Sequence, residues 1–411
     1  MAIRNPWAVL ALLFFVRAAM ALQFQSVAAV APLMTEQFGL GLADIGLLIG
    51  LYFTPGAALA LPGGALGRRL GDRTAVLIGL GLMLMGGAIL LMSSSWSGQV
   101  CGRLVAGTGG VLLNVLMTKM IADCFVGREI ATAMAIFINS WPCGIGVSLV
   151  LLPAIGARFG LVAVNSFVLL LVAIATLCFA TLYKAPRAEE AVLGKGTLPD
   201  AKSGAAVLLA GGIWALYNIG FAMIFSFGPA MLSERGWSMT AAGGAISIVL
   251  WLAVVSVPLG GFLSDYLKEG DLILAGTSAA FGLLLFVLPR SDAVIPLVVV
   301  LGLLCGLPAG PIMALPAQFL KPGTRALGMG LFYTVFYIGM LVGPFLGGRY
   351  ASWTRGAAGA FDFGAIVLAL CPVALLILRR HQHAVPASVA RRQRKHKADP
   401  RQVDLTKVPG S

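Results

Sequence analysis

The sequence predicts an all-α membrane protein in which twelve transmembrane helices form two six-helix bundles. Hydrophobic residues make up 59% of the 411 residues and charged residues only 11%, whereas a soluble domain has about 25% charged residues. Apolar stretches long enough to cross ~30 Å of hydrocarbon as helices recur along nearly the whole chain. A polar stretch separates two sets of six such segments. A water-soluble fold is therefore excluded.

The first apolar stretch follows Arg4 and runs to Leu33. Its beginning, with Ala-Ala-Met-Ala at 18–21, also fits a cleavable signal peptide, but the continuation to Leu33 favours a transmembrane helix. Hydropathy and loop residues predict spans near 7–33, 44–63, 74–95, 98–118, 130–153, 161–183, 205–227, 240–262, 271–289, 293–315, 326–348 and 358–379.

Lysine and arginine are distributed unevenly between the two sides of the predicted membrane. With the N-terminus inside, 22 of the 29 lie on the cytoplasmic side and five outside. Cytoplasmic loops of membrane proteins carry such an excess of positive charge. We therefore expect an integral protein of a bacterial inner (plasma) membrane, with both termini in the cytoplasm.

An internal repeat relates the two halves of the chain. Matching residues lie 197 positions apart in five pairs, which are Pro32 and Pro229, Gly46 and Gly243, Gly64 and Gly261, Arg128 and Arg325, and Gly146 and Gly343. The sequence thus predicts an N-terminal bundle at 1–183, a cytoplasmic linker at 184–204, a C-terminal bundle at 205–379 and a disordered tail at 380–411. Repeats of this kind are typical of transporters that bind substrate between two halves.

The basic tail contains nine lysines and arginines, counted from Arg379. Aromatic residues do not interleave with them, so contact with anionic lipid headgroups is a better interpretation than nucleic-acid binding. All three histidines lie in this region, and the six cysteines lack the spacing of a metal site. We find no nucleotide site, metal cluster or catalytic constellation. We therefore expect no enzyme activity, no cofactor and no nucleic-acid partner.

Two loops carry a repeated motif. One reads Gly64-Ala-Leu-Gly-Arg-Arg-Leu-Gly-Asp-Arg73, and the other reads Gly261-Phe-Leu-Ser-Asp265-Tyr-Leu-Lys268. They resemble the loops that follow the second and eighth helices in the major facilitator superfamily. The resemblance implies the major facilitator fold and secondary transport by alternating access.

In that family the loop latches the cytoplasmic side, and its acid faces the positive N-terminal end of a helix in the opposite half. Asp265 matches the acid, whereas Arg68 occupies the corresponding place in the first loop and leaves Asp72 as a substitute. The alternative is that the arginines of the first loop serve only topology and lipid contact. The predicted gating residues are Gly64, Arg68, Arg69, Asp72, Arg73, Gly261, Asp265 and Arg325.

The fourth span resembles the arginine-x-x-x-glycine motif of the same family. Arg103, Gly107, Gly110 and Asn114 follow one another at helical spacing and so share one face. The face suits the wall of a polar cavity, with Arg103 as a secondary charge partner for substrate. The alternative is that Arg103 snorkels to the outer surface. The run from Arg103 to Asn114 is also similar to the cyanate and nitrate permease branches.

Prolines and glycines in the later spans predict bends. The eleventh span contains Gly343-Pro344, the pattern that antiporters of the family carry in their fifth helix, and the tenth contains Pro308, Pro311 and Pro316. A proline frees a backbone carbonyl and a glycine permits a bend. We expect these helices to flex during gating.

Arg17 lies ten positions into the first span, ~15 Å deep at 1.5 Å per residue. An arginine at that depth costs at least ~2.5 kcal/mol on insertion scales, so it must face a partner or a wet cavity. We expect no acid within any span to pair with it, since Glu36, Asp44, Asp123, Glu129, Glu234, Asp265 and Asp271 lie at span ends or in loops. A cationic cavity selects anions. The alternative is that Arg17 binds carbonyls at a helix break.

The predicted substrate-binding residues are Arg17, Gln25, Tyr52, Arg103, Asn114, Asn139, Trp214, Tyr217, Asn218, Tyr333 and Tyr337. For Tyr52, Asn139, Trp214, Tyr217, Asn218, Tyr333 and Tyr337 the alternative is packing or a place in the interfacial aromatic belt. The expected function is secondary transport of a small anion, either inorganic or a small organic carboxylate, by a monomer in the lipid bilayer, with protons as a candidate coupling ion. A proton-coupled drug or multidrug efflux transporter is the alternative, and a receptor or scaffold on the same fold is a third hypothesis.

Overall fold

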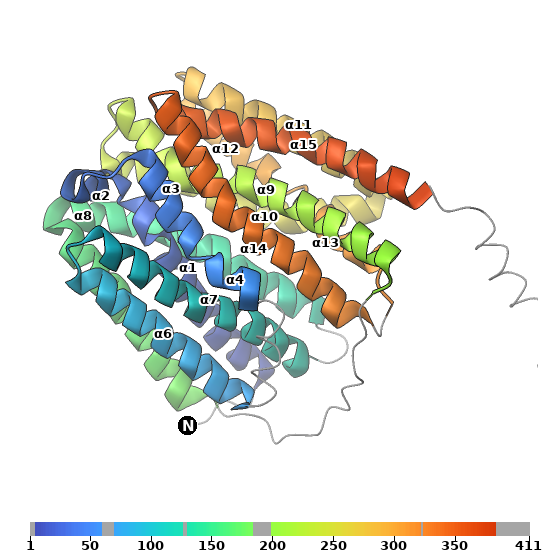
Figure 1. Ribbon diagram of the computed structural model, residues 1–411, viewed down its shortest axis with the longest axis horizontal. Coiled ribbons are helices and arrows are strands. Elements are labelled where there is room, and N and C mark those ends of the chain that lie inside the picture. The colour runs from blue at the N-terminus through green and yellow to red at the C-terminus, as the bar shows by residue number, and fades with distance from the viewer. Residues whose placement is uncertain (1–4, 60–69, 126–129, 184–198, 322–323, 384–411) are drawn as a thin grey trace, which may run out of the picture.

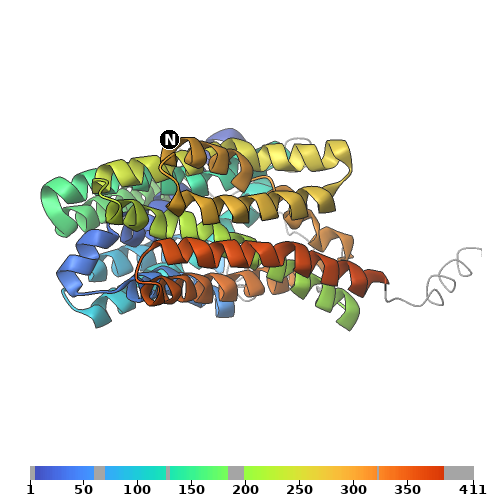
Figure 2. The same cartoon turned by 90° about the horizontal axis from the view of Figure 1, so that it is seen from above.

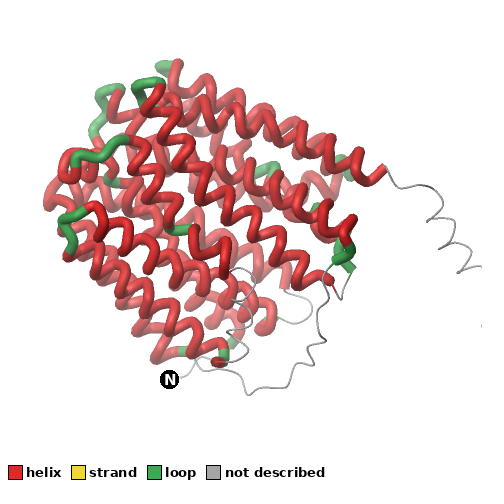
Figure 3. The backbone as a smooth tube through the Cα atoms, in the orientation of Figure 1, coloured by secondary structure: helices red, strands yellow, loops and turns green. Residues whose placement is uncertain are grey.

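The computed structural model describes residues 5–59, 70–125, 130–183, 199–321 and 324–383. The regular elements in these ranges are helices (Figure 3), which confirms the predicted all-α class. The helices run along one common direction (Figure 2). Those before residue 184 are α1 (Pro6–Ala29), α2 (Ala31–Phe38), α3 (Leu42–Leu51), α4 (Thr54–Leu59), α6 (Asp72–Met92), α7 (Trp96–Cys124) and α8 (Ile130–Leu182).

The described part of the second half contains seven α-helices and two short 3-10 helices. They are α9 (Ala201–Glu234), α10 (Met239–Leu267), α11 (Gly270–Val287), η1 (Leu288–Arg290), α12 (Val294–Cys305), α13 (Ala309–Ala314), η2 (Pro316–Gln318), α14 (Arg325–Trp353) and α15 (Ala358–His383).

Eleven segments of the described chain are long and apolar enough to cross a membrane. The longest of them lies within α8, whose 53 residues contain Gly160 at φ 76° and ψ −178°. A side chain is disfavoured at that positive φ, so a glycine allows the chain to turn there. The break separates the predicted spans 130–153 and 161–183, so the described helices correspond to the twelve spans that the sequence predicts.

Three predicted spans are each split into two helices. The span 7–33 breaks at Val30, the span 44–63 at Tyr52 and Phe53, and the span 293–315 at Gly306 to Pro308. A proline lies within three residues of each break, at 32, 55 and 308. Proline lacks the N–H that continues a helix and its ring displaces the preceding turn, so the interruptions have a local cause.

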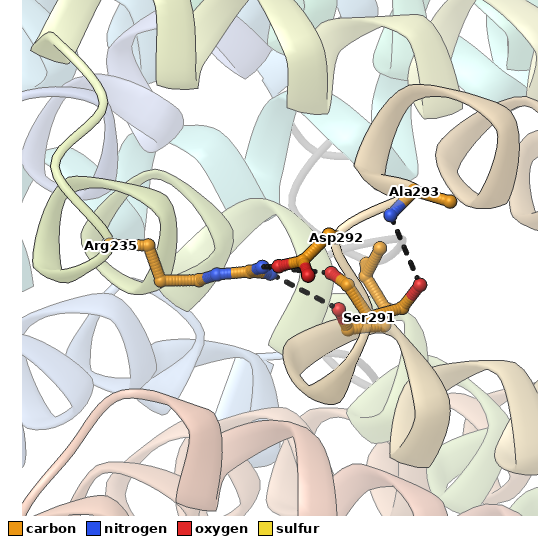
Figure 4. A network of polar contacts seen from close by, with 5 residues as sticks. Arg235, Ser291, Asp292 and Ala293 are labelled. Carbon is orange, nitrogen blue, oxygen red and sulfur yellow. Dashed lines mark hydrogen bonds and ion pairs between the residues drawn. The ribbon is translucent and has the colours of Figure 1, made fainter.

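Ion pairs tie together the helix ends within each half. At the end of the molecule where α1 begins and α15 ends, here called the first end, Lys119 lies 2.7 Å from Asp72 and Arg379 donates at 2.6 Å to Asp271. At the opposite, second end, Arg235 donates to the Ser291 carbonyl at 2.8 Å and to Asp292 at 3.2 Å (Figure 4). Each of these contacts joins helix ends or loops that belong to the same half of the chain.

Glycines bring the two halves together toward the second end. The α3 and α4 helices lie against α14 (Figure 1), and a Cβ on Gly46 would overlap the carbonyl of Pro344. Its repeat counterpart Gly243, in α10, likewise abuts the carbonyl of Leu149 in α8. The 197-residue repeat therefore places equivalent glycines at two equivalent helix crossings, one on each side of the interface.

The predicted domain boundaries fall partly outside the described residues. Most of the linker at 184–204 and most of the tail at 380–411 lie there. The described end of the chain continues as α15 to His383, four residues beyond the predicted span. The division into bundle, linker, bundle and tail stays a prediction.

Candidate functional site

Arg17 is the twelfth of the 24 residues of α1 and therefore lies near mid-depth. Its Nη1 donates to the carbonyls of Phe137 at 3.0 Å and Ile138 at 3.2 Å, and its Nη2 donates to Asn114 Oδ1 at 3.0 Å. Its Nε–H is enclosed and has no acceptor among the described residues. None of these acceptors carries a charge, so the guanidinium is bound but not neutralised.

One of those acceptors is created by a proline. Pro142 lies inside α8 and supplies no N–H to the carbonyl four residues earlier, which belongs to Ile138. Arg17 donates to that freed carbonyl. The interpretation of Arg17 as a residue that binds carbonyls at a helix break therefore describes part of its environment, although the Asn114 contact and the unpaired Nε–H remain.

Two other predicted cavity residues make the same kind of contact across the interface. Gln25 Nε2 donates to the Phe225 carbonyl at 2.6 Å, and Asn139 Nδ2 donates to the Val254 carbonyl at 3.2 Å. Prolines lie four residues after both acceptors, at 229 and 258. Each amide therefore compensates a broken helix in the opposite half of the chain.

A hydrogen-bonded chain leads from Arg17 into the second half. Asn114 accepts from Arg17 through Oδ1 and donates from Nδ2 to the Tyr337 hydroxyl at 3.1 Å. Asn114 belongs to α7 and Tyr337 to α14. Arg17 is thus connected through neutral groups to the helix that packs against α3 and α4.

The described carboxylates lie at or near helix ends. The expectation that no acid falls within a predicted span is wrong for Asp362, which lies inside the span 358–379. It pairs with Arg290, with contacts of 2.7 and 2.9 Å at the second end. Because Arg290 ends η1 and Asp362 is in the second turn of α15, this acid is far along the membrane normal from Arg17.

Aromatic rings surround the region of Arg17. Its guanidinium carbon lies 4.7 Å from the centre of the Phe137 ring and 5.9 Å from that of Trp141, within the range of cation–π attraction. Trp141 stacks on Phe24 at 5.2 Å. The cluster continues through Phe53 to α14, where the ring centre of Phe53 is 6.2 Å from that of Tyr337.

Arg103 is completely buried, so it does not snorkel to a surface. It donates to the carbonyls of Leu48 at 3.0 Å, Gln23 at 3.2 Å and Phe24 at 2.9 Å. Its guanidinium carbon also lies 4.9 Å from the ring centre of Tyr52. All three nitrogens are occupied by the backbone of α1 and α3, a geometry that positions helices rather than presents a charge to a ligand.

The other predicted substrate residues differ in whether their polar side-chain atoms have hydrogen-bond partners. Tyr217 is buried and donates to the Cys305 carbonyl at 2.9 Å, and Asn218 donates to the Trp214 carbonyl of its own helix at 2.8 Å. By contrast, Tyr52 Oη and Trp214 Nε1 are enclosed without a partner among the described residues. Tyr333 stays half-buried on α14, one turn before Tyr337.

Only part of the predicted gate can be placed. Gly64, Arg68 and Arg69 lie outside the described residues, and the side chain of Arg325, which begins α14, is not described. Arg73 donates to the Ala180 carbonyl at 2.8 Å, and a Cβ on Gly310 would meet the Gly261 backbone.

The two gating acids have different surroundings. Asp72 pairs with Lys119 inside its own half, which differs from the expected contact with a helix end of the opposite half. Asp265 is exposed near the end of α10. Its role as a latch stays a prediction.

Sequence reasoning missed the acceptors and several rings of this site. The carbonyls of Phe137 and Ile138 carry no side-chain signal, but the proline at 142 marks Ile138 as a free acceptor. Phe53 and Phe336, which join the aromatic rings of the two halves at 6.2 Å, resemble packing residues in a sequence this apolar. Groups of three or more residues able to hold a metal ion are absent from the part of the chain that the structure describes.

The described helices form a polytopic membrane protein whose two halves interlock, with an unneutralised arginine at mid-depth. The sequence matches the model of the major facilitator superfamily over residues 13–292 and 212–408. The chain belongs to this family. It is therefore a membrane transporter and not an enzyme, as the loop motifs predict.

Individual relatives are distant. The multidrug efflux protein YfmO of Bacillus subtilis strain 168 is 22% identical over 372 residues, covering 87% of this chain and 89% of that protein. The inner membrane transport protein YajR of Escherichia coli strain K12 is 28% identical over 171 residues, covering 40% of this chain. This match spans 37% of YajR.

A solved structure supports the fold. The crystal structure of a bacterial homologue of the human lysosomal transporter Spinster, in an inward-facing and unoccupied conformation, aligns with a TM-score of 0.68. The alignment covers 93% of this chain and 97% of that one, with 17% sequence identity. At this identity the match shows the fold alone.

Proposed function

We propose that this transporter moves a small anion across the membrane by alternating access, with Arg17 as its charge partner. The observation that carries the proposal is the guanidinium at mid-depth, whose acceptors are two carbonyls and one amide oxygen. An uncompensated cation in a medium of low polarity is costly. A bound anion compensates that charge during transport, and planar carboxylates fit the two-pronged geometry of a guanidinium.

Transport in liposomes tests this proposal. The purified protein is reconstituted, and uptake of radiolabelled acetate, benzoate and nitrate is measured for the wild type and Arg17→Gln. We expect uptake of at least one of these anions to disappear in Arg17→Gln. Arg158→Gln is the matched control because Arg158 is exposed near the Gly160 turn of α8, and it should keep the wild-type rate. Equal anion uptake by Arg17→Gln and the wild type contradicts the proposal.

The second candidate is proton-coupled efflux of drugs, supported by the similarity to YfmO along most of both chains. The charge of the transported compound and the effect of Arg17→Gln distinguish the two functions. Anion transport through Arg17 predicts competition between anions and loss of transport in Arg17→Gln. Drug efflux predicts export of cationic dyes that depends on the pH gradient and tolerates Arg17→Gln.

The distribution of basic residues and the similarity to YajR support a membrane location and an orientation for the transporter. The excess of basic residues on one side supports cytoplasmic termini, and YajR is described as an inner membrane protein. With cytoplasmic termini the second end faces outward, and the close contacts of Gly46 and Gly243 between the halves then correspond to a state closed on the outer side. In this arrangement the protein acts as a monomer in a bacterial inner membrane, and protons are the candidate coupling ion.

A further inference from the structure

We infer that the transported anion has an aromatic body: its anionic group binds Arg17, and its ring lies against Trp141, Tyr333, Phe336 and Trp214. The inference rests on the proposed function and narrows its substrate to aromatic carboxylates. These four residues are here called the aromatic wall.

The residues of the aromatic wall are linked from Arg17 into the second half of the chain through the buried ring of Phe53. Trp141 lies 5.9 Å from the Arg17 guanidinium carbon and 6.3 Å from Phe53, whose ring centre is 6.2 Å from Phe336. Phe336 in turn lies 6.2 Å from both Trp214 and Tyr333. The polar path through Asn114 to Tyr337 ends beside the same ring, because Tyr337 and Phe336 are 5.1 Å apart.

The exposure of these rings separates the aromatic wall from packing residues. Trp141, Tyr333, Phe336 and Trp214 are all half-buried, although they contact aromatic rings on neighbouring helices. Their neighbours Phe24, Phe332 and Tyr337 are at most 2% exposed. The cluster therefore has a closed interior and a free face, and the free face belongs to the four wall residues.

Trp214 adds evidence that the wall binds a ligand. A buried indole N–H in a packing cluster ordinarily finds an acceptor. Here Nε1 of Trp214 is enclosed and has none among the described residues, while its ring stacks on Tyr217 at 5.4 Å. An aromatic wall with a spare donor suits a flat ligand that carries its own acceptor.

A small inorganic anion fits this environment poorly. Such an ion needs hydrogen-bond donors on several sides, whereas the rings next to the Arg17 guanidinium, those of Phe137 and Trp141, present faces whose quadrupole is negative. An aromatic carboxylate fits both the guanidinium and the aromatic wall, because its charged group binds Arg17 and its ring packs against the wall residues.

Calorimetric titration of the full-length protein in detergent tests the inference with sodium acetate, nitrate, cyclohexanecarboxylate and benzoate. We expect benzoate to bind about tenfold or more tightly than acetate and nitrate, since ring burial adds to the charge interaction. Cyclohexanecarboxylate should fall between them. Trp214→Leu and Phe336→Leu should each reduce the affinity for benzoate at least about threefold and leave that for acetate unchanged.

Trp353→Leu is the matched control, because Trp353 is 76% exposed at the end of α14, and it should bind benzoate normally. If acetate or nitrate binds as tightly as benzoate and is lost in Arg17→Gln, the aromatic inference fails and the anion proposal stands. Unchanged benzoate binding in both wall variants also overturns the inference. If no anion depends on Arg17, both fail.

Discussion

Gln25 in α1 donates a 2.6 Å hydrogen bond to the carbonyl of Phe225 in α9. That carbonyl lacks a helical donor because residue 229 is a proline. Arg17 with Ile138 and Asn139 with Val254 repeat the relationship. In a bilayer a free carbonyl finds no water, so it must be satisfied within the protein. Polar residues and prolines on different helices therefore act as pairs, and two of these pairs join the two halves.

The first prediction concerns Pro229→Ala. The substitution supplies an N–H to the Phe225 carbonyl within α9. The carbonyl then no longer depends on Gln25 for a donor, so the hydrogen bond between the halves contributes less to their association. We expect the second end to open more often. Spin labels at Phe159 and Trp353, both exposed on different halves toward that end, should show a larger fraction of long distances. Pro372→Ala in α15 is the control, and an unchanged distance distribution in Pro229→Ala contradicts the prediction.

Adjacent glycines in α10 provide a second prediction with an internal control. Gly243→Ala places a Cβ against the Leu149 carbonyl, whereas Gly244→Ala meets nothing within 4 Å. We expect Gly243→Ala to reduce the transport rate severalfold by separating α10 from α8. Gly244→Ala should transport normally and gain about 0.5–1 kcal/mol in stability from its higher helix propensity. Equal rates for the two variants in liposomes would count against tight closure at this crossing.

Arg103→Lys should affect folding more than substrate affinity. An ammonium cannot reach all three carbonyls that the guanidinium holds. Each buried acceptor left unpaired costs roughly 1–3 kcal/mol. We expect a lower melting temperature and reduced yield, measured by fluorescence-detected gel filtration after heating. The fraction that remains folded should bind anions with wild-type affinity. A stable variant with weakened binding would instead make Arg103 a substrate ligand.

The sequence predicted the fold because its evidence is local and repeated. Each span is readable from its own apolar length, and the five repeat pairs relate the halves without knowledge of any contact. The breaks near Tyr52 and Gly306 were less readable, since hydropathy continues through a bent helix. Proline positions carry that information: Pro308 predicted a bend in the tenth span, whereas no prediction was made from the proline at 55.

The site was only partly predictable because its binding partners are backbone atoms. Arg17, Asn114 and Tyr337 were named from their residue types, and the structure joins them in one chain. Gln25, Asn139 and Arg103 were named for the same reason, yet they bind carbonyls whose positions depend on how the helices cross. Residue type identifies a polar side chain, but only three-dimensional packing determines whether its partner is a ligand or a helix.

The last prediction uses Asn114→Asp to neutralise Arg17 from within the protein. The Asn114 Oδ1 lies 3.0 Å from Arg17 Nη2, so a carboxylate of the same shape faces the guanidinium without rearrangement. Its second oxygen faces the Tyr337 hydroxyl at 3.1 Å, which can rotate to donate. The fold should therefore be kept, with an unchanged or higher melting temperature. A substrate anion must then compete with an attached one.

A hydrogen bond to a charged group contributes about 1.5–3 kcal/mol, which corresponds to roughly a ten- to hundredfold loss of anion affinity. Asn114→Leu is the comparison, because it removes the contacts with Arg17 and Tyr337 without adding a charge and leaves Arg17 unneutralised. Anion binding should therefore be weaker in Asn114→Asp than in Asn114→Leu when both are titrated with benzoate. If the substrate is instead a cation, such as a cationic dye, titration with that cation should give the reverse order, since the new carboxylate attracts it. The ranking of the two variants thus reports the sign of the transported charge directly.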